Sequence, residues 1–264
     1  MDFSFAKKLR RSRRRPKGSL AATGIKILHL RNPGVVSWWS AAFPGAGHLL
    51  LGATAEGMFL MVWEIWTNLQ AKINTAILYS MTGRFEQARE VLDTRWLLLY
   101  VPVYVFALWD CYRLTVEINK QSILADREGS TVNAVKIGTL SMNFLDKRNP
   151  WAAAAWSLLA PGTGHIHLGR LHTGLFILVW WIVIAYFSQV LPAIHCTAVG
   201  DLAGARAVLD PRWLLFIPSL YGFAAYDAYT SAVEVNRLFE MEQARFLKDH
   251  YQQPGLEAAL ARGG

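Results

Sequence analysis

The sequence predicts an all-α polytopic membrane protein with two pseudo-symmetric repeats, each a half-helix followed by a two-helix transmembrane hairpin. Hydrophobic residues make up 53% of the 264 positions, with 11 Trp, and only 17% are charged, a composition that favours lipid as the surroundings. The stretch RNPGVVSWWSAAFPGAGHLLLG, residues 31–52, returns as RNPWAAAAWSLLAPGTGHIHLG, residues 148–169. This offset of 117 residues continues without a gap to Asn119 and Asn236, with about 36 identical positions, and indicates a duplicated unit.

The repetition divides the chain into five segments. They are a basic arm (1–30), a first membrane repeat (31–120), a linker (121–147), a second membrane repeat (148–237) and a tail (238–264). Ten of the 27 Lys and Arg residues precede Asn32. A basic arm beside apolar spans predicts a cytosolic anchor for anionic lipid headgroups rather than a nucleic-acid binding site. The tail keeps apolar residues at helical spacing and predicts an amphipathic extension of the last span.

Each repeat opens with an apolar segment that is too short to cross a bilayer. Residues 34–43 and 151–160 hold ten positions each, whereas a helix that spans the hydrocarbon core needs about 20. Proline and glycine then end the helix, and at membrane depth the freed backbone groups require protein or water around them. We therefore predict a re-entrant or interfacial half-helix in each repeat. Its structural turn residues are Pro44, Gly45 and Gly47 in the first copy and Pro161, Gly162 and Gly164 in the second.

Two long apolar runs follow each turn. Residues 54–80 and 171–197 are predicted as the first spans, and residues 96–116 and 213–233 as the second spans. Polar connectors separate the spans and end at Asp93 and Asp210. Each Asp precedes Thr or Pro and then Arg-Trp-Leu, which is typical of a capped helix start.

Two topologies remain open at this stage. Without a crossing by the half-helices, the chain has four spans and parallel copies, with 19 Lys and Arg inside and 5 outside. With a crossing, it has six spans and inverted copies, with 18 inside and 7 outside. Both satisfy the positive-inside bias, and the shortness of the half-helices favours the layout with four spans. We expect a bacterial cytoplasmic membrane, with both termini in the cytosol.

The repeated signature resembles a known family. Pro-Gly-x-Gly-His is followed by Leu-Gly, by a Gly five residues later, and by the pairs Trp109-Asp110 and Tyr226-Asp227. This order resembles the TM-two domain family, small two-span membrane domains with a Gly-rich turn and a His. The resemblance implies tandem, divergent two-span domains and, since that family shares no catalytic activity, no particular reaction. The chain departs from the family after His48 and His165, where Leu-Leu-Leu and Ile-His-Leu replace Arg-Phe-Tyr.

Several polar residues are candidates for a site. His48 and His165 follow the turns; a His can bind metal, but we favour a His that caps the broken backbone and predict no metal and no cofactor. Glu64, Asn68 and Lys72 share one helix face at spacings of four. They form either a functional intramembrane site or a Glu–Lys pair that stabilises the bundle, and the sequence leaves both open.

A second set of acidic residues recurs in both copies. Asp110 and Glu117 lie seven residues apart and return as Asp227 and Glu234, with Arg113 at contact spacing in the first copy alone. The carboxylates could line a cation path, but their position near the cytosolic boundary favours packing or interface groups.

These observations favour a non-catalytic integral membrane subunit or scaffold that binds a protein partner, a second copy of itself or anionic lipid. The alternative is a small ion or small-molecule transporter or channel that uses the polar intramembrane residues. A third hypothesis, a His-dependent membrane enzyme, has less support because no complete catalytic residue set occurs at a recognisable spacing.

Overall fold

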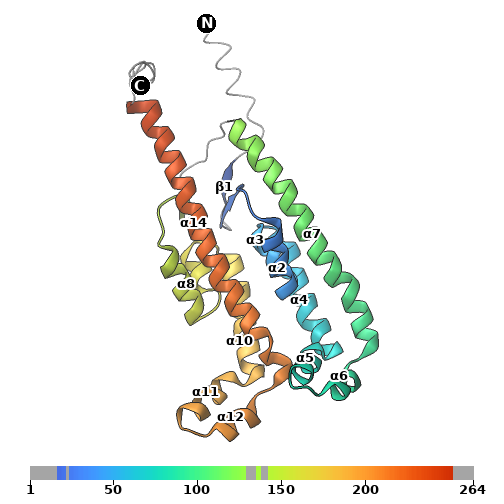
Figure 1. Ribbon diagram of the computed structural model, residues 1–264. Coiled ribbons are helices and arrows are strands. Elements are labelled where there is room, and N and C mark those ends of the chain that lie inside the picture. Colours follow the sequence, from blue (N-terminus) through green and yellow to red (C-terminus); the bar gives the residue numbers. More distant parts are fainter. Residues whose placement is uncertain (1–16, 22–23, 129–134, 138–141, 252–264) are drawn as a thin grey trace, which may run out of the picture.

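The computed structural model describes residues 17–21, 24–128, 135–137 and 142–251, and most of them are helical. Two long helices, α7 (Thr94–Arg127) and α14 (Phe216–Tyr251), run in the same direction along the molecule (Figure 1). We call the end at which both of them finish the terminal end, and the opposite end the distal end. Here residues 31–127 are called the first half and residues 148–251 the second half.

The shorter helices follow the same order in both halves. The first half contains α2 (Pro33–Ala42), α3 (Ala46–Leu50), α4 (Thr54–Ala71), α5 (Ile73–Met81) and α6 (Phe85–Val91) before α7. The second half contains α8 (Pro150–Leu159), α9 (Thr163–His167), α10 (Leu171–Ser188), α11 (Val190–Ala198), α12 (Leu202–Val208) and α13 (Pro211–Leu214) before α14. Each helix from α8 to α13 begins 117 residues after its counterpart among α2 to α7.

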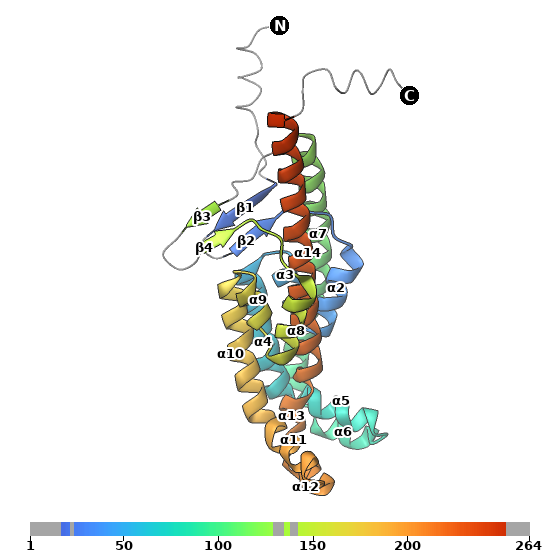
Figure 2. The same ribbon diagram turned by 90° about the vertical axis from the view of Figure 1, so that its left-hand side faces the viewer.

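The half-helices α2 and α8 begin toward the terminal end and end at sharp turns near the middle of the molecule (Figure 2). Gly45 has φ +94° and Gly162 has φ +102°, a left-handed conformation that glycine adopts without steric cost. A Cβ at either position would also meet a backbone oxygen of α4 or α10, that of Gly57 or Gly174. The turn therefore requires glycine for two reasons, its backbone conformation and the lack of space for a side chain. The short helices α3 and α9 then return the chain to the start of α4 and α10.

The predicted first spans are wrong as continuous helices. Helix α4 ends at Ala71 and α10 ends at Ser188, because Lys72 (φ 58°) and Gln189 (φ 57°) adopt the left-handed conformation. Each residue joins the span to a separate pair of short helices at the distal end, α5–α6 or α11–α12 (Figure 2). The chain then returns to its point of departure, since the Asp93 N–H donates to Ala71 O at 3.2 Å and the Asp210 N–H to Ser188 O at 3.1 Å.

The predicted starts of the second spans are confirmed. The Asp93 side chain accepts from the N–H groups of Arg95 and Trp96, and Asp210 accepts from that of Arg212. Helix α7 continues through Pro102. The second half is interrupted at Leu215, between α13 and α14, where Pro218 has no N–H to donate to the carbonyl four residues earlier.

Strands and helix lengths at the terminal end differ from the expectation. Strands β1 (Gly18–Ala21) and β2 (Gly24–Ile27) form an antiparallel pair, as do β3 (Val135–Ile137) and β4 (Met142–Phe144) (Figure 2). The sequence pattern predicts helices alone and no element in these segments. Helix α7 also extends past residue 120, and α14 extends to Tyr251 as the predicted tail helix. The predicted lipid-binding residues 1–16 lie outside the described residues.

Apolar side chains from both halves form one core. Phe43, Leu49 and Met61 of the first half are almost fully buried together with Ile177, Leu220 and Phe223 of the second half. Trp39 adds edge and tilted ring contacts with Phe223 and Tyr226. The core therefore holds the two halves against one another around the half-helices.

Candidate functional site

A His–Asp contact joins each short helix after the turn to a long helix. In the first half, His48 Nε2 on α3 lies 3.1 Å from Asp110 Oδ2 on α7. In the second half, His165 Nε2 on α9 lies 2.9 Å from Asp227 Oδ2 on α14. All four side chains are buried or nearly so. The signature His and the signature Asp, which lie 62 residues apart in both halves, thus form a pair that the sequence analysis did not predict.

The first His–Asp pair has further partners on α7 and α2. Asp110 Oδ1 accepts from Arg113 Nη2 at 2.6 Å, and the same guanidinium donates to Glu117 Oε1 at 2.7 Å. The other ring nitrogen, His48 Nδ1, lies 3.2 Å from Cys111 Sγ, and that sulfur is 3.0 Å from Ser40 Oγ. The prediction that His48 caps the turn backbone is therefore wrong, because its ring nitrogens contact the side chains of Asp110 and Cys111. Arg113 joins Asp110 to Glu117, the two carboxylates that the sequence places on one helix face.

The second His–Asp pair uses a different cation. Arg170, which follows the Leu-Gly after the turn, donates to both oxygens of Asp227, at 2.9 and 2.8 Å, and to Ser231 Oγ at 2.6 Å. Its Nη2 also donates to the carbonyl of Leu49 in the first half at 3.3 Å. Glu234 does not join this site; it binds Arg31 and His29, each at 2.6 Å. Arg170 therefore connects the second site to the turn of the first.

The arrangement of Cys111, His48 and Asp110 has the order of a nucleophile, a base and an orienting carboxylate. However, Cys111 has no exposed surface, and His48 is 1% exposed. A substrate cannot reach a sulfur atom in this position without opening the contact between α2 and α7. The geometry therefore favours a structural network over a catalytic one.

Glu64 and Asn68 belong to a separate polar network at the distal end of α4. Asn68 Nδ2 donates to Glu64 Oε1 at 3.0 Å and to Asn74 Oδ1 at 3.2 Å, and Asn74 Nδ2 donates to the carbonyl of Arg212 at 2.8 Å. Lys72 does not take part, since it is exposed and lies in the turn after α4. The predicted Glu–Lys pair is therefore wrong; the helix ends before Lys72, and Asn74 takes the third place in the cluster.

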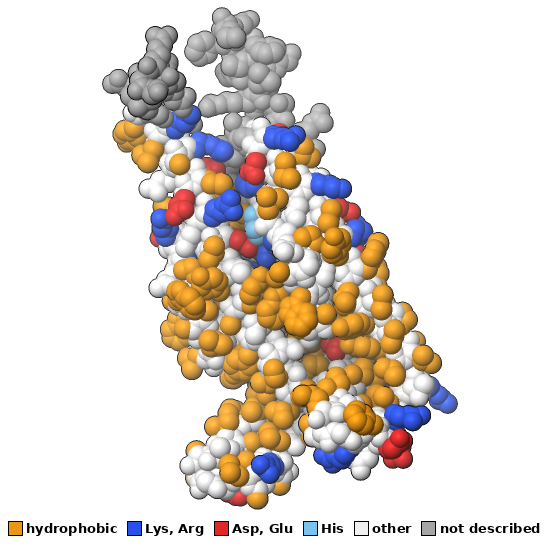
Figure 3. Space-filling view, viewed as in Figure 1, with side chains coloured by type: hydrophobic (Ala, Val, Ile, Leu, Met, Phe, Trp, Pro, Cys, Tyr) orange, Lys and Arg blue, Asp and Glu red, His pale blue; other side chains and the backbone are white. Residues whose placement is uncertain are grey.

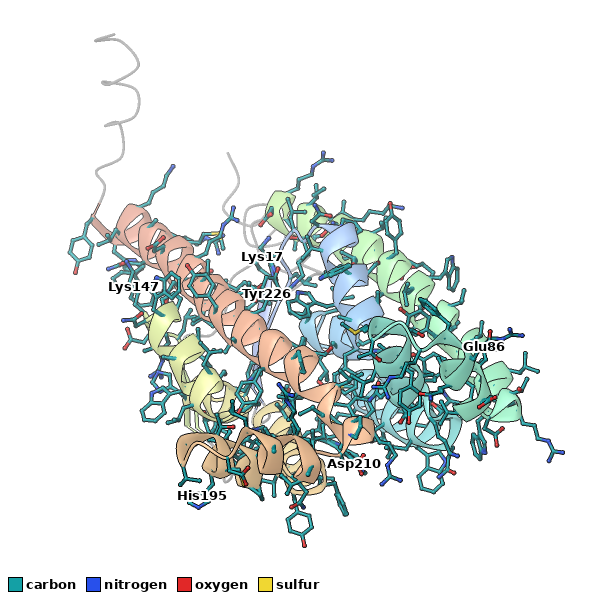
Figure 4. The ribbon with its side chains drawn as sticks, turned by 60° about the horizontal axis from the view of Figure 1, so that its bottom comes forward. Lys17, Glu86, Lys147, His195, Asp210 and Tyr226 are labelled. Carbon is teal, nitrogen blue, oxygen red and sulfur yellow. The ribbon has the colours of Figure 1, made fainter. Side chains whose placement is uncertain are left out.

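Two cavities lie at the terminal end, between the halves. The larger, of about 700 Å³, has an apolar floor that includes Leu51 and Leu114, and a polar side with Arg31, Arg170 and Glu234. The smaller, of about 370 Å³, is lined by Lys17 and Tyr226, both labelled in Figure 4. Asn119 and Asn236 border this end, and each exchanges two hydrogen bonds with the backbone of Arg31 or Arg148.

The first half also brings together one set of atoms that could hold a metal ion. Donor atoms of His48, Glu56 and Asp110 all lie within 4.8 Å of one another. Neither the repeated signature nor the spacing of polar residues singles out Glu56, Cys111, Asn74 or Arg170. One signal was available for two of them: Glu56 and Arg170 are charged residues whose counterparts, Thr173 and Ala53, are not.

No family model, curated protein or solved structure matches this chain. The resemblance to the TM-two domain family therefore stays a prediction.

Proposed function

We propose that this protein is a non-catalytic integral membrane subunit, in which tandem two-span units form a scaffold for a partner protein or a second copy. One observation carries the proposal: large apolar side chains cover the outside of the helices between the two polar ends (Figure 3). They are more than one-third exposed on α4, α7, α8 and α10, and include Phe59, Trp66, Leu98, Val105, Phe106, Leu159, Leu175, Val179, Ile182 and Tyr186. In water, an apolar surface of this extent has a high free-energy cost.

Helix dimensions support this proposal. Among the described residues, α7 and α10 are long and apolar enough to cross a membrane, whereas α4 and α14, which we propose as the other two spans, do not meet the same measure of length and hydropathy. With a rise of 1.5 Å per residue, α7 is about 50 Å long, so a hydrocarbon core of about 30 Å leaves its terminal part outside. That part of α7 carries Lys120, Asp126 and Arg127, and Lys17, the first residue that the structure describes, pairs with Asp126 there. We assign this side to the cytosol.

The internal ion pairs support a structural role. A charge inside a bilayer is costly and is usually paired. Asp110, Asp227 and Glu234 each contact a basic side chain of the same chain, and the two His–Asp pairs connect the half-helices to the long helices. Their main effect is then to stabilise the re-entrant geometry.

Reporter fusions test the topology. Fused after residue 130, a reporter that is active only in the cytosol should be active; after residue 205, in α12, it should be inactive. Both results follow from four spans and parallel copies. An external residue 130 would contradict this layout, because it requires crossing half-helices and inverted copies.

Cross-linking in the native membrane tests the scaffold. We expect a discrete adduct with one partner or with a second copy, and a matching mass after purification in lipid nanodiscs. A chain that stays monomeric in the membrane and in nanodiscs, without a stoichiometric partner, would contradict the proposal.

A transporter is the second candidate, and the Glu64 network favours it. Glu64 is 5% exposed, and its carboxylate interacts with the side chains of Asn68 and Tyr100 but with no basic residue among those described. Buried carboxylates of this kind often mark ion or proton pathways. In proteoliposomes, Glu64→Gln should then abolish a cation or proton flux that Glu86→Gln, on the exposed distal helix α6, leaves intact. The absence of flux in the wild type would retire this candidate.

A further inference from the structure

We infer that the first half binds one divalent transition-metal ion of the zinc class, with His48, Glu56 and Asp110 as ligands. The three side chains come from the short helix α3, the first turn of α4 and the middle of α7. Imidazole and carboxylate groups are common ligands of Zn²⁺. An ion at this point would connect the three helices near the middle of α7.

Distances between the donor atoms suit such an ion. Ligands about 2.1 Å from a tetrahedral Zn²⁺ lie about 3.4 Å from one another. His48 Nε2 and Asp110 Oδ2 are already 3.1 Å apart, and all three donors lie within 4.8 Å. Glu56 is exposed, and no hydrogen bond or ion pair to another described residue holds it. A rotation of its side chain is therefore enough to complete a three-ligand site, with the fourth position open.

The surroundings of these ligands match those of metal sites. A metal-bound His usually donates its second N–H to a nearby acceptor, and a bound carboxylate is usually fixed by another hydrogen bond. Cys111 Sγ lies 3.2 Å from His48 Nδ1, and Arg113 holds the second oxygen of Asp110. By contrast, the corresponding nitrogen of the second half, His165 Nδ1, is buried and has no hydrogen-bond partner among the described residues.

The second half shows what replaces the ion. Position 170 there is Arg where the first half has Ala53, and position 173 is Thr where the first half has Glu56. The Arg170 guanidinium contacts both oxygens of Asp227 and so supplies a positive charge beside the His–Asp pair. In the first half, Arg113 pairs with Asp110 and Glu117, and Glu56 brings a third carboxylate close to Asp110 and His48. A divalent ion would balance this excess negative charge.

Zinc titration of the purified, chelator-free full-length protein tests the inference directly. Wild type should bind one Zn²⁺ per chain by calorimetry, and bound Co²⁺ should give visible absorption from nitrogen and oxygen ligands. Glu56→Thr, which installs the residue of the second half, should weaken binding by more than the ~10–100-fold that loss of an outer partner costs. Glu86→Thr, on distal α6 (Figure 4), is the matched control and should bind as wild type does.

A transplant sharpens the test. The double variant Arg170→Ala, Thr173→Glu gives the second half the ligand set of the first, and we expect two Zn²⁺ per chain. Zn²⁺ should also raise the melting temperature of wild type but not that of Glu56→Thr, whose elution in size-exclusion chromatography should be unchanged. Equal Zn²⁺ affinity of wild type and Glu56→Thr would overturn the inference, as would no stoichiometric binding by wild type.

Discussion

The His48–Asp110 contact of the first half and the His165–Asp227 contact of the second half have the same geometry but different electrostatic surroundings. Arg113 reaches Asp110 from the same helix, and its side chain is 43% exposed. Arg170 reaches Asp227 from across the turn, and its side chain is 15% exposed beside a fully buried carboxylate. Both halves thus have an arginine beside the Asp carboxylate, but the two arginines stand at different positions of the repeat.

This comparison distinguishes two requirements of the fold, the His–Asp contact and the compensation of the Asp charge. The His–Asp contact fixes the half-helix against the long helix, and both halves retain it at the same spacing. Charge compensation for the Asp can come from any direction, because Coulomb attraction depends on distance rather than on a particular backbone position. Arg170 additionally contacts the backbone of the first half, so the second site also contributes to the packing between halves.

Loss of the two carboxylates should give the largest contrast. Asp227→Ala leaves Arg170 and His165 without their partner in a buried site, and we expect a loss of about 3–5 kcal/mol of unfolding free energy. Asp110→Ala should cost about 1–2 kcal/mol, since Arg113 is partly exposed and keeps Glu117 as a partner. Denaturant titration in detergent measures both. Equal losses would show that burial does not distinguish the two sites.

The turn glycines should behave alike in both halves. Gly45→Ala and Gly162→Ala each force a left-handed residue and place a Cβ against a backbone oxygen. The two effects together should cost about 2–4 kcal/mol in either half. Thermal unfolding of the two variants side by side is the measurement. A difference above about 1 kcal/mol between them would contradict the equivalence of the two turns.

The asparagines at the terminal end should show a smaller, equal effect. Asn119 and Asn236 each donate to and accept from the backbone of one residue, Arg31 or Arg148. Alanine at either position removes two hydrogen bonds, and we expect a loss of about 1–2 kcal/mol. Hydrogen exchange at residues 31 and 148 provides the readout. A loss of stability in only one of the two variants would contradict the equivalence of Asn119 and Asn236.

The smallest effect concerns the helix caps at the distal end. Hydrogen bonds from Arg212 hold the pKa of Asp210 below its usual value of 3.8. A carboxyl whose pKa is lowered by folding stabilises the folded state above the unfolded pKa, and the gain disappears as the pH falls through the folded pKa. Asp210→Asn should therefore cost about 0.5 kcal/mol at neutral pH, and its gap from wild type should close below about pH 4. A gap that widens in acid would contradict this assignment.

The sequence predicted local features of the fold better than contacts between distant residues. Asp93 and Asp210 were recognisable as caps, and Pro44 and Gly45 as a turn, because each signal depends on neighbouring residues. Lys72 was placed wrongly, since an apolar run continues past it and no Gly or Pro marks the left-handed break. The His48–Asp110 contact crosses 62 residues, and neither periodicity nor propensity reports on contacts at that separation.

The candidate site was predictable in part for the same reason. Both members of each His–Asp pair were singled out within the repeated signature, but their mutual contact required coordinates. Glu56 and Arg170 are two of the positions at which the two repeats differ in charge. Positions at which the two repeats differ are therefore as informative about a site as positions at which they agree.

The hydrogen bonds from the Asp93 and Asp210 amides back to Ala71 and Ser188 mean that the chain leaves and re-enters each span at adjacent backbone atoms. Residues 189–209 thus leave the bundle and rejoin it at one place. An insertion such as a fluorescent reporter or an epitope fits there with little disturbance to the bundle, and natural variants of this protein have the freedom to enlarge, shorten or exchange that periphery while the spans keep their packing.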